Sequence, residues 1–149
     1  MPAGPNPAWW RAAGIWAWLL VAGAPVPLTS QTNGGHEGWQ IPLDAATELN
    51  PVPMNPVELA KGRSLYRSKC QRCHGVEGKG NGPDADPNHA PSDLTDGRRA
   101  SRNPDGVMFY KIWNGRSKPK MPAMKSDMSR IDVWTVILYV KTLSAPASK

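Results

Sequence analysis

Apolar residues recur at helical spacing in three segments of this 149-residue chain. The first segment begins after Asn55 and reaches Cys70, the second lies within 103–115, and the third follows Ser129 and ends near residue 143. Almost no stretch alternates apolar and polar residues in the way that a strand does. The pattern therefore predicts an all-α fold of three helices joined by long irregular segments.

Local signals mark where two of these helices begin. Asn55 can cap the first helix, Pro56 suits its first position, and Glu58 is placed for a capping box. Ser129 and Asp132 form the corresponding pair at the start of the third helix. The apolar residues of this last helix lie on more than one of its faces, so we expect it to be largely buried.

The second predicted helix is opened by Pro104 and ended by Gly115. Trp113 in this helix and Trp134 in the third fall at helical spacing beside other apolar residues. Both tryptophans are therefore predicted to pack in the core.

The segments outside the helices are rich in glycine and proline, which together make 30 of the 149 residues. Residues 31–54 are predicted to form a linker or an extended strap, and residues 75–102 a long loop. Pro119 and Pro122 bracket Met121 and exclude regular structure there. A loop as long as 75–102 is unusual in a compact domain unless something other than secondary structure organises it.

The N-terminal 30 residues are predicted to be a signal peptide or an N-terminal anchor. Residues 12–24 form an uncharged, mostly apolar run of 13, which is short of the ~20 residues of a membrane-spanning helix. Residues 22–24 have the small-x-small form of a cleavage site, but Pro25 follows directly. Cleavage nearer Ser30 and retention as an uncleaved anchor both stay open, and the segment has no cysteine that could carry a lipid.

The chain has two cysteines, Cys70 and Cys73, and His74 follows the second directly. Cys-x-x-Cys-His is the spacing for covalent haem attachment. Two intervening residues on a helical turn let both thiols reach the vinyl groups on neighbouring edges of one porphyrin, and His74 then projects over the ring toward the iron. Export agrees with this interpretation, because thioether attachment takes place outside the cytoplasm.

Other uses of the cysteines fit less well. Structural zinc usually takes four Cys or His ligands, and adjacent Cys73 and His74 would not converge easily on one tetrahedral ion. A thioredoxin-like pair expects a βαβ context, which the pattern lacks. A disulfide between Cys70 and Cys73 would close a very small loop and leave His74 without a role. The sequence therefore favours one covalently attached haem c.

Haem iron takes a second axial ligand, and Met121 is the predicted one. A thioether in a loop held by two prolines suits an electron-transfer site, and methionine raises the reduction potential relative to a second histidine. Met124 and Met128 are alternatives that would equally serve as core residues. His89 is a further alternative, but it lies only 15 residues after His74 and is expected to be exposed.

Taken together, these motifs resemble a class I c-type cytochrome over residues 55–143, and 55–149 is predicted to be that domain. The resemblance implies a small domain of three or more helices wrapped round one haem, with the Gly/Pro-rich loops packed on the porphyrin. It also implies that Gly62 permits close crossing by the last helix at Tyr139. "HAPSDLT" resembles the loop under the proximal ligand, which implies that the Pro91 carbonyl accepts the N–H of the ligand His74. "KPKMPAM" resembles the distal loop and again favours Met121.

The implied function is single-electron transfer between periplasmic or membrane-bound redox proteins, without enzymatic activity. A haem enzyme or gas-binding haem protein with an open distal site is the alternative, and a bound Met121 thioether would exclude it. "IPLDAATELNPVP" before the domain is also similar to the monohaem subunit of bacterial alternative complex III, a quinol-oxidising assembly. That subunit is commonly held by a lipidated cysteine, which this chain lacks.

The chain is basic, with a formal net charge of +6, and its positive residues concentrate in two stretches. Residues 61–72 hold five basic residues and no acid, and residues 111–130 hold six and Asp127 alone. The charge predicts either docking to an acidic redox partner, such as a quinol-oxidising complex, a terminal oxidase or a dehydrogenase, or a solvated face that offsets the haem propionates. A nucleic-acid partner is not expected, because no aromatic stacking pattern accompanies the charges.

Overall fold

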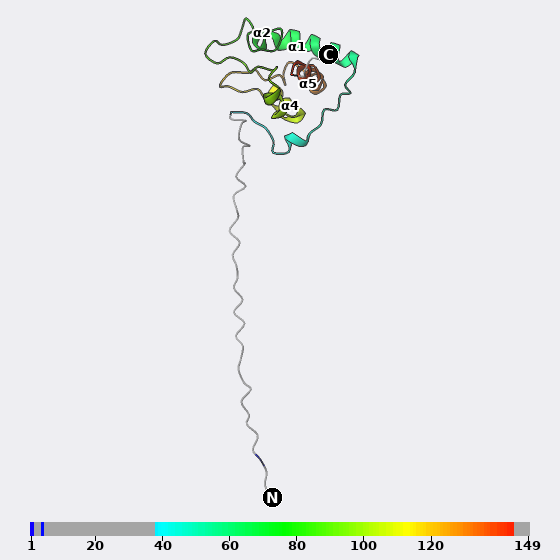
Figure 1. Cartoon of the computed structure of the whole chain (residues 1–149), viewed down its shortest axis with the longest axis vertical. Helices are drawn as coiled ribbons and strands as arrows, with labels where there is room; N and C mark the ends of the chain where they lie inside the picture. The colour runs from blue at the N-terminus through cyan, green and yellow to red at the C-terminus, as the bar shows by residue number, and fades with distance from the viewer. Residues whose placement is uncertain (2–3, 5–37, 145–149) are drawn as a thin grey trace. The chain divides into compact units, whose positions relative to one another are not determined.

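The computed structural model of the chain describes residues 1, 4 and 38–144 (Figure 1). The chain divides into two units, residues 1–30 and 31–149, and the account below concerns the second. The predicted signal peptide or anchor lies outside the described residues, apart from Met1 and Gly4. No helix in the described part combines the length and apolar character that a bilayer crossing requires.

The domain is all-α in the described residues, as predicted from the sequence. It has five α-helices and one 3-10 helix, and its single β-type contact is an isolated bridge between Arg116 and Met121. The elements are η1 (Ala45–Thr47), α1 (Pro56–Lys69), α2 (Gln71–His74), α3 (Gly97–Ser101), α4 (Asp105–Asn114) and α5 (Arg130–Leu143).

The predicted helix starts are confirmed. The Asn55 side chain accepts a hydrogen bond from the Glu58 amide at 3.0 Å, and Pro56 occupies the first turn of α1. The Ser129 hydroxyl accepts one from the Asp132 amide at 3.1 Å at the start of α5. Each cap satisfies an amide that has no partner within its helix.

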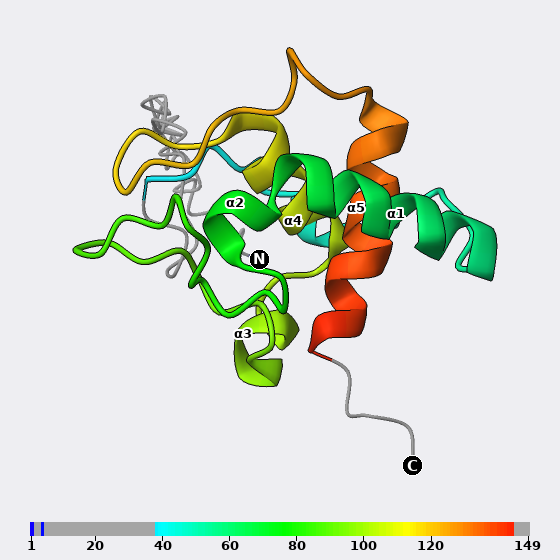
Figure 2. The same cartoon turned by 90° about the horizontal axis from the view of Figure 1, so that it is seen from above.

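The crossing of α1 and α5 organises the domain (Figure 2). A Cβ atom added to Gly62 would lie 2.5 Å from the Thr135 carbonyl oxygen and 3.1 Å from Cβ of Tyr139, so only glycine fits. The rings of Tyr66 and Tyr139 pack beside this contact, with centroids 5.3 Å apart. The crossing predicted at Gly62 and Tyr139 is confirmed.

The hydrophobic core lies between α5 and α4. Phe109 is fully buried. Its ring stacks on those of Trp134 and Trp113, with centroid distances of 4.4 and 5.6 Å. The predicted packing role of both tryptophans is therefore confirmed. The predicted burial of α5 is also confirmed, because it contributes the buried residues Val133, Trp134, Thr135, Val136, Ile137, Leu138 and Val140.

Two short helices, η1 and α3, were not predicted, and α3 corrects the expectation of an unbroken loop over 75–102. In α3, the Asp96 carboxylate accepts hydrogen bonds from the amides of Arg98 at 2.9 Å and Arg99 at 3.3 Å. This N-cap stabilises one turn inside a segment whose composition otherwise favours loop.

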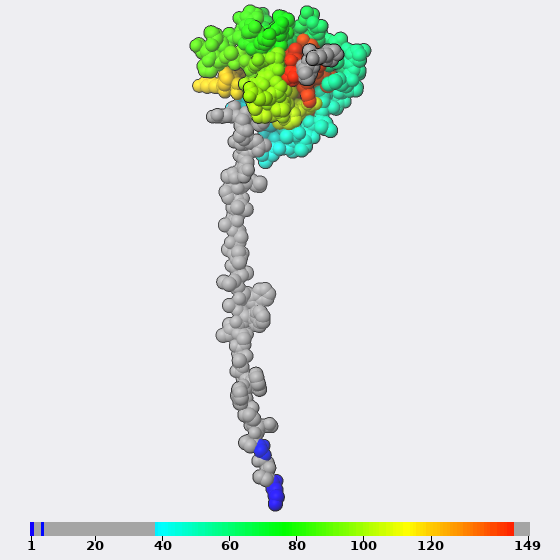
Figure 3. All heavy atoms as spheres, viewed as in Figure 1, coloured from blue at the N-terminus to red at the C-terminus, as the bar shows by residue number. Residues whose placement is uncertain are grey.

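Residues 38–54 run along the domain and are held at several points. Ala45 in η1 is 1% exposed and lies so close to α4 that a Cβ on Gly106 would be 2.0 Å from its carbonyl oxygen. The Asn50 side-chain amide donates to the Trp134 carbonyl at 2.9 Å. The space-filling view shows these residues, in cyan, against the yellow-green residues of the domain (Figure 3). We call residues 38–54 the strap.

Candidate functional site

The two cysteines and the histidine lie on one helical turn. α1 ends at Lys69, and α2 continues directly with Gln71–His74. The amides of Cys73 and His74 donate to the Cys70 carbonyl at 3.2 and 2.9 Å. The local geometry is therefore the one that the Cys-x-x-Cys-His spacing predicts.

The loop after His74 folds back on this turn. The buried Tyr66 hydroxyl donates to the Gly75 carbonyl at 2.7 Å, and the Gly80 amide donates to the His74 carbonyl at 2.8 Å. Gly80 has a positive φ of 76°, and a Cβ there would lie 2.2 Å from the Pro91 carbonyl oxygen. The backbone at Gly80 and the backbone at Pro91 are therefore too close for a side chain to lie between them.

The carbonyl that faces the imidazole belongs to Ser92. Nδ1 of His74 lies 3.3 Å from the Ser92 carbonyl oxygen. The sequence resemblance placed Pro91 in this position, one residue earlier. The structure differs because the Pro91 carbonyl is directed at Gly80 instead.

Burial controls the protonation of His74. Burial lowers the pKa of its imidazole below the ordinary value, and the Ser92 carbonyl opposes this only in part. The neutral ring is therefore favoured. If Nδ1–H donates to Ser92, the lone pair remains on Nε2, where it can bind a metal.

The cysteines are free thiols, and the described residues contain no disulfide. Burial, with a smaller contribution from Cys73, raises the pKa of Cys70 to about 12. Cys70 lines a cavity, whereas the Sγ of Cys73 lies 3.8 Å from the Asp84 carbonyl oxygen.

Met121 lines the same cavity as Cys70 and His74. Its backbone forms a two-bond bridge with Arg116, with both N–H···O distances 2.9 Å. Met124 and Met128 are buried in the hydrophobic core, at 9% and 7% exposure. Met108 of α4 also lines the cavity, and sequence reasoning did not consider it.

The other sequence candidate for a ligand, His89, is on the surface. Its side chain is 63% exposed, and Nδ1 lies 3.3 Å from the Asp86 carboxylate. The expectation that His89 is exposed is confirmed.

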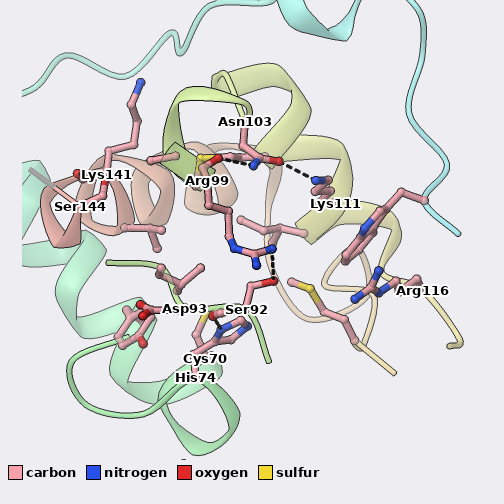
Figure 4. A pocket seen from close by; sticks show the side chains of 18 residues that line it. Cys70, His74, Ser92, Asp93, Arg99, Asn103, Lys111, Arg116, Lys141 and Ser144 are labelled. Carbon is pink, nitrogen blue, oxygen red and sulfur yellow. Dashed lines mark hydrogen bonds between the residues drawn. The ribbon is translucent and has the colours of Figure 1, made fainter. Parts of the chain in front are cut away.

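The cavity has a volume of about 210 Å³ and is bounded by residues far apart in sequence (Figure 4). Its apolar wall comes from the strap, α1, α4, α5 and the loop before α3. The apolar and aromatic residues in this wall are Trp39, Tyr66, Leu94, Met108, Ile112 and Val140. A wall of this kind suits a flat apolar group.

Three cations line the cavity with no carboxylate within ion-pair distance, and the Asp93 carboxylate lines it as well. Arg99, Lys111 and Arg116 make no ion pair with any described residue. Lys111 Nζ donates to the Asn103 side-chain oxygen at 2.5 Å, and Arg99 Nη1 donates to the Ser92 hydroxyl at 3.3 Å (Figure 4). Burial, followed by repulsion from Arg116 and Arg99, lowers the pKa of Lys111 to about 8. Such a cluster favours a ligand with negative charge at this end of the cavity.

The residues therefore fit haem c. Two thiols are one turn apart, a neutral imidazole and a thioether share one cavity with an apolar wall, and unpaired cations match the two propionate carboxylates of the group. Cys70, Cys73, His74 and Met121 are the residues that would hold it.

Several basic residues of the two positive stretches are paired locally. Lys61 lies 2.8 Å from Asp132, and Arg72 lies 2.6 Å from Asp84. Arg130 contacts Glu48 at 3.7 Å. These pairs, together with the turn of Lys111 and Arg116 toward the cavity, reduce the positive charge available to a docking partner.

Comparison with known proteins gives the family. A family model described as "Cytochrome C oxidase, cbb3-type, subunit III" matches residues 57–140, which is more than half of the chain. A chain of the reducing HAO-like protein complex of Kuenenia stuttgartiensis has a similar structure, with a TM-score of 0.51 and 27% sequence identity. The similarity covers 62% of this chain and 46% of that chain, so this chain spans less than half the length of that relative. No curated protein matches the sequence.

Proposed function

This chain belongs to the family of cytochrome c domains that carries the description cytochrome c oxidase, cbb3-type, subunit III, and we propose that it transfers single electrons through one haem c held by Cys70, Cys73, His74 and Met121. Electron transfer is the function that a cytochrome c domain implies.

One observation carries the ligand assignment. Cys70, His74 and Met121 come from distant segments of the chain and line a single cavity. Haem bound there supplies reversible one-electron chemistry at iron. His74 would bind it through Nε2, and the Ser92 carbonyl would fix the orientation of the ring.

The remaining residues of the site exclude water and balance charge. The loop closed by the Arg116–Met121 bridge brings the thioether to the cavity. The apolar wall would keep solvent from the group, and Lys111, Arg99 and Arg116 would offset its carboxylates. With both His74 and Met121 bound to the group, no position would remain for a substrate, so the proposed role is that of a carrier and not of an enzyme.

The proposed setting is the periplasm, or the periplasmic side of a membrane to which the N-terminal segment tethers the domain. The proposed partners are redox proteins with an acidic docking face, such as a quinol-oxidising complex, a terminal oxidase or a dehydrogenase. Basic residues outside the local ion pairs, among them Lys118, Lys120 and Lys125, support such an encounter.

Substitution of the methionines tests the ligand assignment. The oxidised wild-type protein should be low-spin, with a weak far-red charge-transfer band from the iron–thioether bond. Met121→Ala should abolish this band and open the iron to carbon monoxide in the reduced state. Met108→Ala, in the same cavity wall, and Met124→Ala, in the core, are the matched controls and should keep the band.

Three results would contradict the proposal. Rapid carbon monoxide binding by the wild-type protein would favour a haem enzyme or gas-binding protein with an open distal site. Loss of the band in Met108→Ala or Met124→Ala alone would reassign the ligand. An unchanged pyridine-haemochrome spectrum in Cys70→Ala would exclude two thioether bonds.

A further inference from the structure

The strap precedes the segment that the family model matches, yet it reaches the cavity. The match begins at residue 57, whereas Trp39 is part of the cavity wall. The strap is fixed near this point, because the Asn114 side-chain amide donates to the Gln40 carbonyl at 3.0 Å. Family membership therefore does not account for Trp39.

Trp39 contacts two of the three unpaired cations. The centroid of its ring lies 4.3 Å from the Arg116 guanidinium carbon and 5.4 Å from Lys111 Nζ. Arg116 and Lys111 lie on the same side of the cavity (Figure 4). A planar guanidinium over an indole face is the most favourable arrangement of this kind.

Arg116 in turn closes the loop that carries Met121. Its backbone pairs with Met121 through two hydrogen bonds of 2.9 Å, and its Nε donates to the Pro119 carbonyl at 3.0 Å. The base of the loop is tight, since a Cβ on Gly115 would lie 2.4 Å from the Met121 carbonyl oxygen. The Arg116 side chain thus links the 116–121 loop to the Trp39 ring on which its guanidinium lies.

We propose that Trp39 is a positioning residue for the distal ligand: by stacking on Arg116, the strap holds the 116–121 loop in place and keeps the Met121 thioether on the iron. This inference rests on the proposed function, specifically on Met121 as an axial ligand. It gives the strap a role in the redox site that is distinct from its packing against α4 and α5.

Ligand exchange on the oxidised holoprotein tests the proposal, with imidazole as the probe. Exogenous imidazole binds only when the thioether leaves, so its apparent affinity reports how firmly the loop is held. Trp39→Ala should raise this affinity about 2- to 30-fold, the range that corresponds to one partly shielded cation–π contact. Trp39→Phe should restore part of the wild-type behaviour, because a ring face remains.

Two further variants separate positioning from general destabilisation. Arg116→Lys keeps the charge but loses the planar stack and the Nε bond to Pro119, and it should resemble Trp39→Ala. The two changes combined should give no more than the larger single effect. Asn50→Ala removes a strap anchor to α5 far along the strap, so it should lower stability and leave imidazole affinity unchanged.

The outcomes distinguish this inference from the proposed function. A wild-type protein without the far-red band would overturn the Met121 assignment itself. A wild-type band together with equal imidazole affinities in Trp39→Ala and Asn50→Ala would overturn only the role of Trp39. Additive effects of Trp39→Ala and Arg116→Lys would also overturn it, because they would show that the two residues act independently.

Discussion

Replacement of Gly62 by alanine tests the helix crossing on which the site is built. The added Cβ would lie 2.5 Å from the Thr135 carbonyl oxygen, roughly 1 Å closer than an ordinary van der Waals contact. The two neighbours of the added atom, the Thr135 carbonyl oxygen and the Tyr139 Cβ, cannot move without the backbone of α5. The two helices must therefore separate. Separation would weaken packing along the whole α1–α5 interface.

The expected net effect follows from two opposing contributions. Overpacking of a tight core contact costs about 1–3 kcal/mol. Alanine is the better helix former by about 1 kcal/mol, which offsets part of this cost. Since the neighbour is a rigid backbone oxygen, we expect the overpacking cost toward its upper end and a net loss of about 1–2 kcal/mol in the free energy of unfolding.

Urea denaturation of the holoprotein measures this loss. With a slope of about 2 kcal/mol per molar urea, the midpoint should fall by roughly 0.5–1 M while the slope stays constant. Gly97→Ala is the matched control, because Gly97 is exposed at the start of α3 and its nearest neighbour, the Ser144 carbonyl oxygen, would be 3.9 Å away. The control should be neutral or slightly stabilising. If Gly62→Ala proved as stable as Gly97→Ala, the close crossing would be refuted.

Two further predictions concern hydrogen bonding and pH. Tyr66→Phe should lower the free energy of unfolding by about 1–2 kcal/mol, because it leaves the Gly75 carbonyl without its buried donor. Tyr139→Phe is the control and should lower it less, because it loses no hydrogen bond to a described residue. Equal losses in the two variants would contradict the role of this hydrogen bond. The lowered pKa of His74 means that the unfolded chain binds its proton more readily, so the free energy of unfolding should fall as the pH drops below about 6.5. Urea titrations between pH 7.5 and 5 measure this loss, and a free energy of unfolding that stays constant over this range would be the contrary result.

The main helices were predictable because their signals are local. Asn55 with Glu58, and Ser129 with Asp132, lie within one turn of each other, so their side chains can cap in any context. The Cys-x-x-Cys-His turn was predictable for the same reason, since its residues are consecutive. The fold class followed from these helices and from the absence of strand periodicity.

The features that could not be predicted depend on contacts between residues far apart in the sequence. Which loop carbonyl faces His74 is decided by the packing of Pro91 against Gly80, and this moved the partner from Pro91 to Ser92. Trp39 gave no signal, because its contacts to Arg116 and Lys111 lie more than 70 positions away. The α3 turn did carry a signal in Asp96, hidden by the loop-like composition around it.

The burial of Cys70 bears on the order in which such a protein is assembled in the cell. A thiol with a pKa of about 12 is almost entirely protonated at neutral pH, and only the thiolate is a strong nucleophile. If haem is joined to Cys70, the finished domain is therefore a poor substrate for the joining reaction. Attachment belongs before the closure of the fold, on a chain that is still open around Cys70, and premature folding would compete with maturation.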